Sequence, residues 1–292
     1  MTMGLASLPM YVSNQDAVTQ LWAAVAAQLR EQGLANTPQA LMWPTDLHAH
    51  WLNPDLLLSQ TCGYPLMDDL AGKVQLVGCF QYDAPGCEGI TCHSVLIARD
   101  EHADLALEDF RGLRAAFNVS NSQSGYNAFR ARFAPLSING KFFRSTLETG
   151  GHRLSVDAVR AGMADLASID CVTYAGLKRY SPEAIQGLHV VGYTASYPGL
   201  PLITSGKTSA RDLQTMQSVL ASAFSNPHAA QALRDLGIVG FENPPAQIYQ
   251  RCMDMREAAI ALGYPTLAQI FQDLLKSEGL SNRVLQNSQS TL

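Results

Sequence analysis

Apolar residues follow two different periods along the chain, and these periods predict alternating strands and helices. Short apolar or β-branched runs predict strands at residues 6–12, 56–60, 74–82, 90–99, 113–119, 146–149, 166–169 and 190–194. Apolar residues between these runs recur at helical spacing, most clearly over residues 17–29, which follow Ser13 and Asn14 at the position of a helix cap. This alternation is typical of an α/β fold.

The order of these elements predicts two lobes rather than one. Extended segments near residue 99 and over residues 191–200 join two α/β units, which indicates a double crossover and a hinge with a cleft between the lobes. We expect residues 1–97 and 196–292 to form lobe 1 and residues 98–195 to form lobe 2. The stretch 208–278 reads as almost entirely helical and should return to lobe 1, while the polar tail from Ser281 should fray.

Composition and charge limit the partners of the protein. The chain has 292 residues, of which 47% are hydrophobic and 15% charged, and its formal net charge is −5. It can fill a sizeable core, and it offers no global basic field, so we expect no nucleic-acid partner. Residues 98–195 carry eleven Lys or Arg against ten Asp or Glu, which makes lobe 2 the more favourable half for an anion.

Targeting signals are weak or absent in this sequence. No apolar run approaches the ~20 residues of a transmembrane helix, so we expect no direct membrane insertion. Residues 1–12 lack the basic region of a secretory signal, so the protein is expected to be cytoplasmic as encoded, or periplasmic if a leader was removed. The six scattered cysteines favour free, mostly buried thiols, and a Cys62–Cys87 disulfide would require export.

The most informative motif is the polar segment Asn118-Val-Ser-Asn-Ser-Gln-Ser-Gly-Tyr-Asn127, which lies between a predicted strand and a predicted helix. Free N–H groups at a helix start form an anion site, the serine hydroxyls add donors, and Gly125 allows close approach of a ligand. The alternative is an ordinary helix cap with more polar residues than it needs.

Two further segments follow the same strand-to-helix plan. Thr149-Gly-Gly-His152 places a histidine at the mouth of a helix, where it could donate to an oxyanion or merely belong to a capping loop. Leu57-Leu-Ser-Gln-Thr-Cys-Gly-Tyr64 is the third, and all three strand ends would open onto one cleft if the lobes face each other. His48 and His50 lack partners at metal-ligand spacing, so we read them as an exposed loop pair and expect no metal.

In combination, these segments resemble the phosphate/phosphonate-binding family of ABC-transporter substrate-binding proteins, which have the type II periplasmic-binding-protein fold. The similarity runs over roughly residues 5–240 and rests on LLLSQTCGYPL (56–66), YDAPGCEGITCHSVLIARD (82–100), LEDFRGLRAAFNVSNSQSGYNAFR (107–130), TGGHRLSVDAVRAGMADLASID (149–170) and VVGYTASYPGLPLIT (190–204).

The resemblance implies a ligand-binding site between the lobes. The family has a Ser-Thr-Ser-Gly turn that binds the phosphonate oxygens, and it corresponds to Ser122, Gln123, Ser124 and Gly125, followed by Tyr126. The family's histidine corresponds to His152. Its acidic residue, which can bind an amino group of the ligand, corresponds to Asp170. In lobe 1 the resemblance points to Tyr11 and to Ser59, Gln60 and Tyr64. Where the family commonly has Tyr-x-Ser, this chain has Cys92-His93-Ser94, with Tyr82 or His93 as substitutes for the missing tyrosine.

The resemblance therefore implies a solute-binding protein without a cofactor. It would capture a small oxyanion, most readily a phosphonate or phosphate ester, by hinge closure, and pass it to an ABC-transporter permease. Two alternatives stay open at this point: a cytoplasmic enzyme on the same fold, of the cofactor-biosynthesis type, and a ligand-sensing regulatory module.

Overall fold

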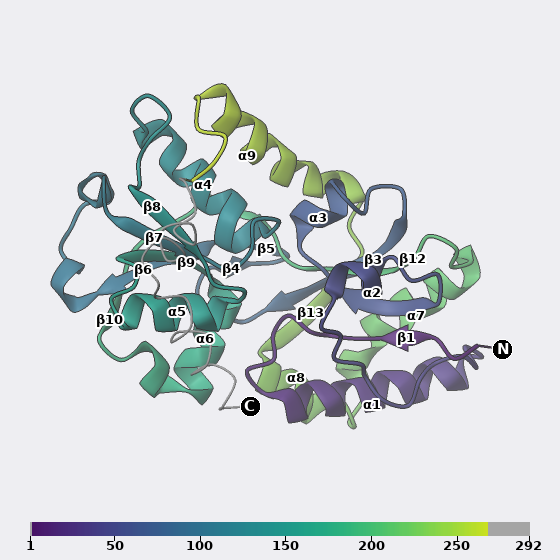
Figure 1. Cartoon of the computed structure of the whole chain (residues 1–292). Coiled ribbons are helices and arrows are strands. Elements are labelled where there is room, and N and C mark those ends of the chain that lie inside the picture. Colours follow the sequence, from purple (N-terminus) through teal and green to yellow (C-terminus); the bar gives the residue numbers. More distant parts are fainter. Residues whose placement is uncertain (1, 268–292) are drawn as a thin grey trace.

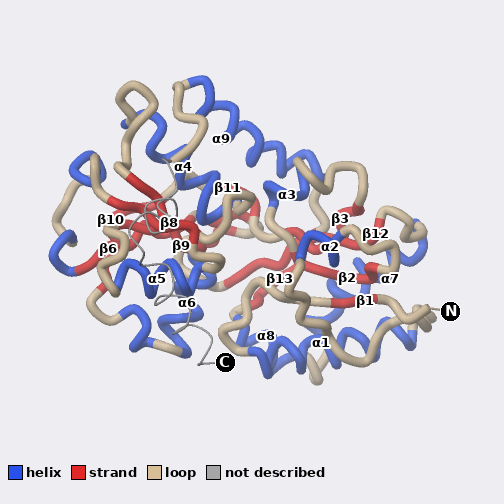
Figure 2. The backbone as a smooth tube through the Cα atoms, in the orientation of Figure 1, coloured by secondary structure: helices blue, strands red, loops and turns tan. Residues whose placement is uncertain are grey.

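The computed structural model describes residues 2–267 and consists of two α/β lobes that lie side by side (Figure 1). Each lobe is built on one five-stranded sheet, and a small third sheet lies between them. The chain runs from the first lobe into the second and back again (Figure 2). The fold is therefore α/β and two-lobed, as the sequence predicts.

The sheet of the first lobe has the strand order β1-β2-β12-β3-β13. Its strands are β1 (Leu5–Ala6), β2 (Leu56–Gln60), β12 (Pro201–Ser205), β3 (Val74–Tyr82) and β13 (Ile238–Glu242). β1 and β2 are parallel, whereas β12 is antiparallel to both β2 and β3. Strand β12, which comes late in the chain, thus occupies the centre of a sheet that early strands begin.

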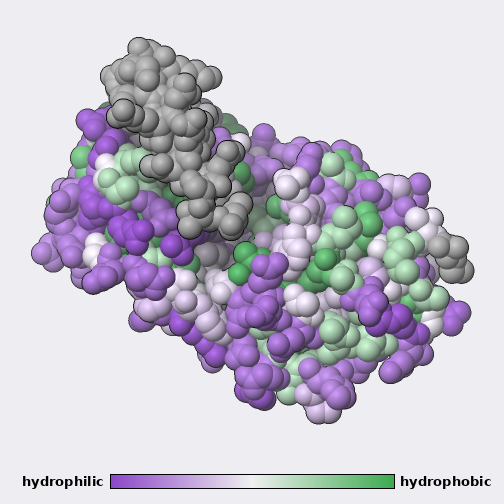
Figure 3. All heavy atoms as spheres, turned by 60° about the horizontal axis from the view of Figure 1, so that its bottom comes forward, coloured by the Kyte–Doolittle hydropathy of each residue, from purple (hydrophilic) through white to green (hydrophobic). Residues whose placement is uncertain are grey.

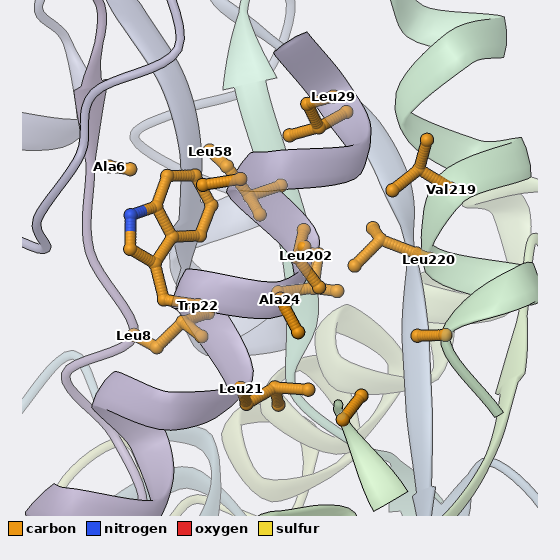
Figure 4. Packing of buried hydrophobic residues seen from close by; sticks show 14 of the residues in the cluster. Ala6, Leu8, Leu21, Trp22, Ala24, Leu29, Leu58, Leu202, Val219 and Leu220 are labelled. Carbon is orange, nitrogen blue, oxygen red and sulfur yellow. The ribbon is translucent and has the colours of Figure 1, made fainter. Parts of the chain in front are cut away.

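Helices α1 (Gln15–Glu31), α7 (Ala210–Ser222) and α8 (Ala230–Leu236) pack together against this sheet. The apolar face of α1 places Trp22 and Leu29 among residues of β2, β12 and α7, as Figure 4 shows. Asn14 caps α1 by accepting a hydrogen bond from the backbone N–H of Ala17 at 3.0 Å, as the spacing predicts. Two short helices, α2 (Leu47–Trp51) and α3 (Gly63–Met67), flank β2.

The sheet of the second lobe has the strand order β10-β6-β9-β7-β8. Its strands are β10 (Leu188–Tyr193), β6 (Ser94–Arg99), β9 (Leu166–Asp170), β7 (Arg114–Phe117) and β8 (Ser145–Glu148), and its helices are α4 (Ala128–Phe133), α5 (His152–Arg160) and α6 (Cys171–Tyr180). Strands β7, β8 and β9 are parallel, so the segments that follow β7, β8 and β9 emerge at one edge of the sheet.

The small sheet β11-β5-β4 joins the lobes. Strands β4 (Cys87–Glu88) and β5 (Thr91–Cys92) belong to the outgoing crossover, and β11 (Tyr197–Pro198) belongs to the returning one. Tyr197 pairs with Cys92 across the two crossovers. We call β4, β5 and β11 the hinge sheet.

Helix α9 (Gln250–Ala261) follows the short helical turn Ala246–Tyr249 and packs on α3 of the first lobe and on α4 of the second (Figure 1). It therefore spans both lobes. None of the helices in residues 2–267 combines the length and apolar character of a membrane span. Hydrophilic residues cover much of the face in Figure 3, with hydrophobic side chains scattered among them.

Several predicted elements need correction. The first strand is only Leu5–Ala6, and the strand predicted at 90–99 is broken at His93 into β5 and β6. The region from 208 is not all helical, because β13 adds an edge strand to the first sheet. The predicted helical residues 268–278 and the polar tail from 281 lie outside the described residues.

Candidate ligand-binding site

The polar segment after β7 forms the structural centre of the candidate site. A single π-type turn over Gln123–Asn127 leads into α4, and Ser122 caps it by accepting a hydrogen bond from the backbone N–H of Gly125 at 3.1 Å. The side-chain amide of Asn118 donates to the same hydroxyl oxygen at 3.0 Å. We call Ser122–Gly125 the anion turn.

Gly125 is required in this turn for steric reasons. A Cβ at this position would lie 2.1 Å from Oδ1 of Asn118, well inside van der Waals contact. That oxygen is buried and has no hydrogen-bond partner among the described residues. Any side chain at position 125 would therefore push the asparagine away from the turn.

His152, the first residue of α5, supports the turn from the next strand end. Its Nε2 lies 2.8 Å from the hydroxyl oxygen of Ser124. Burial lowers the pKa of His152 to about 4, so the imidazole is neutral near pH 7. An Nε2–H donor to Ser124 would leave the serine hydroxyl free to donate to a bound oxyanion.

Two other serines fix the backbone of the turn. The hydroxyls of Ser94 and Ser168 both donate to the carbonyl oxygen of Ser124, at 3.0 Å and 2.8 Å. The Ser94 hydroxyl also lies 2.6 Å from the phenol oxygen of Tyr197 in the hinge sheet. The turn is thus held by side chains from β6, β9 and the hinge.

Asp170, at the end of β9, connects the two lobes. Its carboxylate caps α6 by accepting from the backbone N–H groups of Val172 and Thr173, and it accepts from the Tyr11 hydroxyl of lobe 1 at 3.1 Å. Burial, reinforced by the neighbouring Cys171, raises the pKa of Asp170 to about 7. This carboxyl group is therefore close to half-protonated at neutral pH.

Aromatic residues of lobe 1 surround the Tyr11–Asp170 contact. Tyr82 packs edge-on against Tyr11 with ring centroids 5.0 Å apart, and the Gln60 amide donates to the Tyr82 hydroxyl at 3.3 Å. These three lobe 1 side chains line a cavity of about 100 Å³ whose other wall is α6. The cavity extends the interlobe space on the α6 side.

The structure thus brings together most of the predicted residues: Ser122, Ser124, Gly125 and His152 around the anion turn, with Ser94 behind it, and Asp170, Tyr11, Gln60 and Tyr82 at the lobe contact. His93 lies near this second group. Its Nε2 is buried without a partner among the described residues, and its ring contacts Tyr193.

Four predicted residues point elsewhere in this structure. The side-chain oxygen of Gln123 accepts a hydrogen bond from the Asn127 amide at 2.8 Å, and its side-chain nitrogen donates to the sulfur of Met255 on α9 at 3.3 Å. Tyr126 packs edge-on against Phe117 in the lobe 2 core. The Ser59 hydroxyl lies 2.7 Å from that of Ser7 inside lobe 1. Tyr64 on α3 is half-buried beside charged residues of α9 and α4.

Sequence reasoning missed the residues that brace the turn. Asn118, Ser168 and Tyr197 act through contacts between separate strands, which no local pattern reveals. Cys62 was considered only as a free thiol or a disulfide partner of Cys87, yet it lies against the anion turn. The backbone N–H of Gln123 and the Ser122 hydroxyl donate to its sulfur, although burial outweighs them and raises the thiol pKa to about 11. Lobe 1 therefore reaches the anion turn through this thiol.

The structure also shows where the predicted histidine pair and the cysteines lie. His50 is buried in α2 and lies 2.9 Å from the Ser7 hydroxyl, so only His48 of the pair is exposed and the loop prediction is wrong. Within residues 2–267, no cluster of three or more His, Cys, Asp or Glu could hold a metal. All six cysteines are free thiols, and the sulfur of Cys87 lies 3.5 Å from that of Cys171.

Comparison with known proteins identifies the fold. PhnD1 from Prochlorococcus marinus, solved with methylphosphonate, is 14% identical with a TM-score of 0.71 and covers 88% of this chain and 97% of its own. A phosphonate-transporter binding protein from Pseudomonas aeruginosa, PA3383, is 17% identical with a TM-score of 0.71 over both full lengths. XAC2383 from Xanthomonas citri, solved with ATP, is 16% identical with a TM-score of 0.68 and covers 90% of this chain and 98% of its own.

These solved structures share the type II periplasmic-binding-protein fold, which confirms the predicted architecture. No curated protein sequence matches the chain. A sequence model of the family described as "ABC transporter, phosphonate, periplasmic substrate-binding protein" matches residues 53–249, more than half of the chain. Members of this family bind solutes and are not enzymes, as the resemblance implied. On the strength of that match, the chain belongs to the periplasmic substrate-binding proteins of phosphonate ABC transporters.

Proposed function

We propose that the protein binds a small phosphonate or phosphate ester at the anion turn and delivers it, in the periplasm, to its cognate permease. The observation that carries this proposal is the turn itself, where the hydroxyls of Ser122 and Ser124 lie 3.5 Å apart and Nε2 of His152 lies 2.8 Å from the Ser124 hydroxyl. Such preorganised donors suit a tetrahedral oxyanion.

The lobes divide the binding task between them. Residues 98–195 form lobe 2 and hold the oxyanion, whereas residues 2–97 and the described residues from 196 onward form lobe 1 and close over it. Tyr11, Gln60 and Tyr82 then cover the substituent of the ligand beside Asp170. Closure turns on the hinge sheet, which both crossovers share.

Neutral donors are sufficient for useful affinity. Three or four hydrogen bonds to a charged ligand contribute ~1.5–3 kcal/mol each, or ~5–10 kcal/mol before the cost of closure. Micromolar binding needs about −8 kcal/mol. The anion turn therefore supports micromolar binding without an arginine clamp.

Asp170 selects the substituent. With a pKa raised to about 7, it accepts a hydrogen bond from an ammonium group when ionised and tolerates an alkyl phosphonate when protonated. Affinity for methylphosphonate should therefore fall as the pH rises through 7, while affinity for 2-aminoethylphosphonate should rise.

Titration calorimetry with both phosphonates, inorganic phosphate and a nucleoside monophosphate tests the assignment. A Ser122→Ala/Ser124→Ala double variant should lose at least ~100-fold in affinity, because two hydrogen bonds to a charged group are removed. Ser120→Ala is the matched control, since Ser120 is exposed at the edge of the same segment and should bind like wild type. Equal affinities for the double variant and wild type would refute the site.

A further inference from the structure

Three cysteines that ligand binding does not require converge where the hinge sheet meets lobe 2. Cys87 and Cys92 are paired residues on β4 and β5, and paired residues on antiparallel strands project to the same face. Cys171 opens α6, and its sulfur lies 3.5 Å from that of Cys87. The three thiols thus form one cluster, beside Asp170.

From this geometry we propose that Cys87 and Cys171 are a modification site, a dithiol that a small or protein disulfide oxidises to an intramolecular bridge. A disulfide needs a sulfur separation of about 2.05 Å, so the two sulfurs have only ~1.5 Å to close. Cys87 is half-buried, so an oxidant can reach it, whereas Cys92 and Cys171 are buried.

The reaction balances as two thiol–disulfide exchanges. Cys87 passes its proton to the Cys171 thiolate 3.5 Å away and attacks one sulfur of the oxidant, which forms a mixed disulfide and releases one thiolate. Cys171 then loses that proton to solvent and is a thiolate again. The Cys171 thiolate then attacks the Cys87 sulfur and expels the second thiolate. Two protein thiols are oxidised, and one oxidant disulfide is reduced to two thiols.

The environment of Cys171 suits the second step. Its sulfur lies at a helix N-terminus and accepts hydrogen bonds from the Cys87 and Cys92 thiols and from the backbone N–H of His93, which together lower its pKa. The same contacts raise the pKa of Cys87 and Cys92. Cys171 is therefore the thiolate of the cluster.

The bridge would tie the hinge sheet to lobe 2 and would close a loop between residues 84 positions apart. Periplasmic proteins meet disulfide oxidants, whereas cytosolic thiols are kept reduced. Oxidation should raise the thermal unfolding midpoint by several degrees, because a long loop is constrained in the unfolded chain.

Thiol mapping tests the proposal on the full chain. The reduced protein is exposed to oxidised glutathione, alkylated in denaturant and digested for mass spectrometry. We expect two of the six thiols to disappear into one peptide pair that joins Cys87 to Cys171, and Cys92→Ala to give the same pair. Cys87→Ala and Cys171→Ala should give no intramolecular bridge.

Six alkylated thiols after oxidation, or a bridge that contains Cys62 or Cys92, would overturn the proposal. The half-buried Cys87→Ala change keeps the test informative if the buried Cys171→Ala variant fails to fold. The readout needs no ligand, so its result is independent of the proposed substrate class.

Discussion

Replacing Asp170 by asparagine should change how stability depends on pH. Asp170 is 2% exposed. The side-chain oxygen of asparagine can still accept from the α6 N–H groups, while its NH2 group takes the place of the second oxygen and would donate to the Tyr11 hydroxyl. Asparagine does not ionise, so the substitution removes one proton equilibrium and keeps the helix cap. The pH profile of unfolding therefore isolates the buried carboxyl group.

The size of the effect follows from the raised pKa. Burial and Cys171 raise the pKa of Asp170 from an ordinary 3.8 to about 7. A raised carboxyl pKa gives stability that is fully present below the unfolded value and is lost as the pH rises through the folded value. About three pKa units correspond to roughly 4 kcal/mol, which wild type should lose between about pH 4 and pH 8.

His152 contributes in the opposite direction. Burial lowers the pKa of His152 from 6.5 to about 4. The contribution of this group to the stability of the fold is therefore present above pH 6.5 and is lost as the pH falls through 4. This amounts to at most about 3 kcal/mol, because the ring is only partly buried. In wild type the pH dependences of the two groups offset each other. In Asp170→Asn only the contribution of His152 remains, so the free energy of unfolding should increase with pH.

Urea unfolding followed by circular dichroism between pH 4 and pH 8, in phosphate-free buffer without ligand, measures the difference. The free energy of unfolding of Asp170→Asn minus that of wild type should increase by about 4 kcal/mol over this range. Asp46→Asn makes the same change at an exposed helix cap and serves as the control. A difference that stays constant with pH would refute the reasoning.

Three further changes test other parts of the structure. Gly125→Ala should lower the free energy of unfolding, measured by chemical denaturation, by about 1–3 kcal/mol and should weaken phosphonate binding. In the control Gly151→Ala the added Cβ would meet no atom within 4 Å, so the loss should be under about 1 kcal/mol. Equal losses in the two variants would contradict the steric argument. Tyr180→Phe removes a 2.5 Å hydrogen bond between the lobes, from the end of α6 to the Asp235 carbonyl of lobe 1. It should raise the rate of ligand dissociation in stopped-flow fluorescence. An unchanged rate would show that this contact does not stabilise the closed state. Asp165→Asn removes the carboxylate that pairs with Arg99 and Arg114. It should lower the free energy of unfolding by about 3 kcal/mol at pH 7 in urea titrations. A loss below about 1 kcal/mol would mean that solvent replaces the carboxylate.

Local patterns predicted the elements that the site uses, because strand, cap and helix are encoded by neighbouring residues. The segment from Leu113 to Phe133 shows this: β7 and α4 lie within the strand and the helix that the periodicity predicts, and the polar segment between them supplies the cap, Ser122, although no pattern singled that serine out. Edge strand β13 was missed, because Ile238–Glu242 is short, only Ile238 is buried, and helices flank it in the sequence.

The supporting contacts could not be predicted, because they join residues far apart in the chain. Ser168 on β9 and Ser94 on β6 both donate to the Ser124 carbonyl. These two strands are far apart in the sequence and become neighbours only in the sheet. Cys87 has five other cysteines as possible partners by sequence, and sequence spacing does not single out Cys171. The function came instead from the resemblance, which the family model now supports.

The central position of β12 has a consequence for the order of folding during synthesis. Lobe 2 is one continuous segment, and its first and last strands pair at Val95 and Tyr193, so it can complete its sheet as soon as β10 leaves the ribosome. The first lobe must wait, because β2 and β3 meet only through β12. Although translation begins in the first lobe, the second lobe should mature first, and β2 and β3 cannot join one sheet until β12 has been synthesised after it.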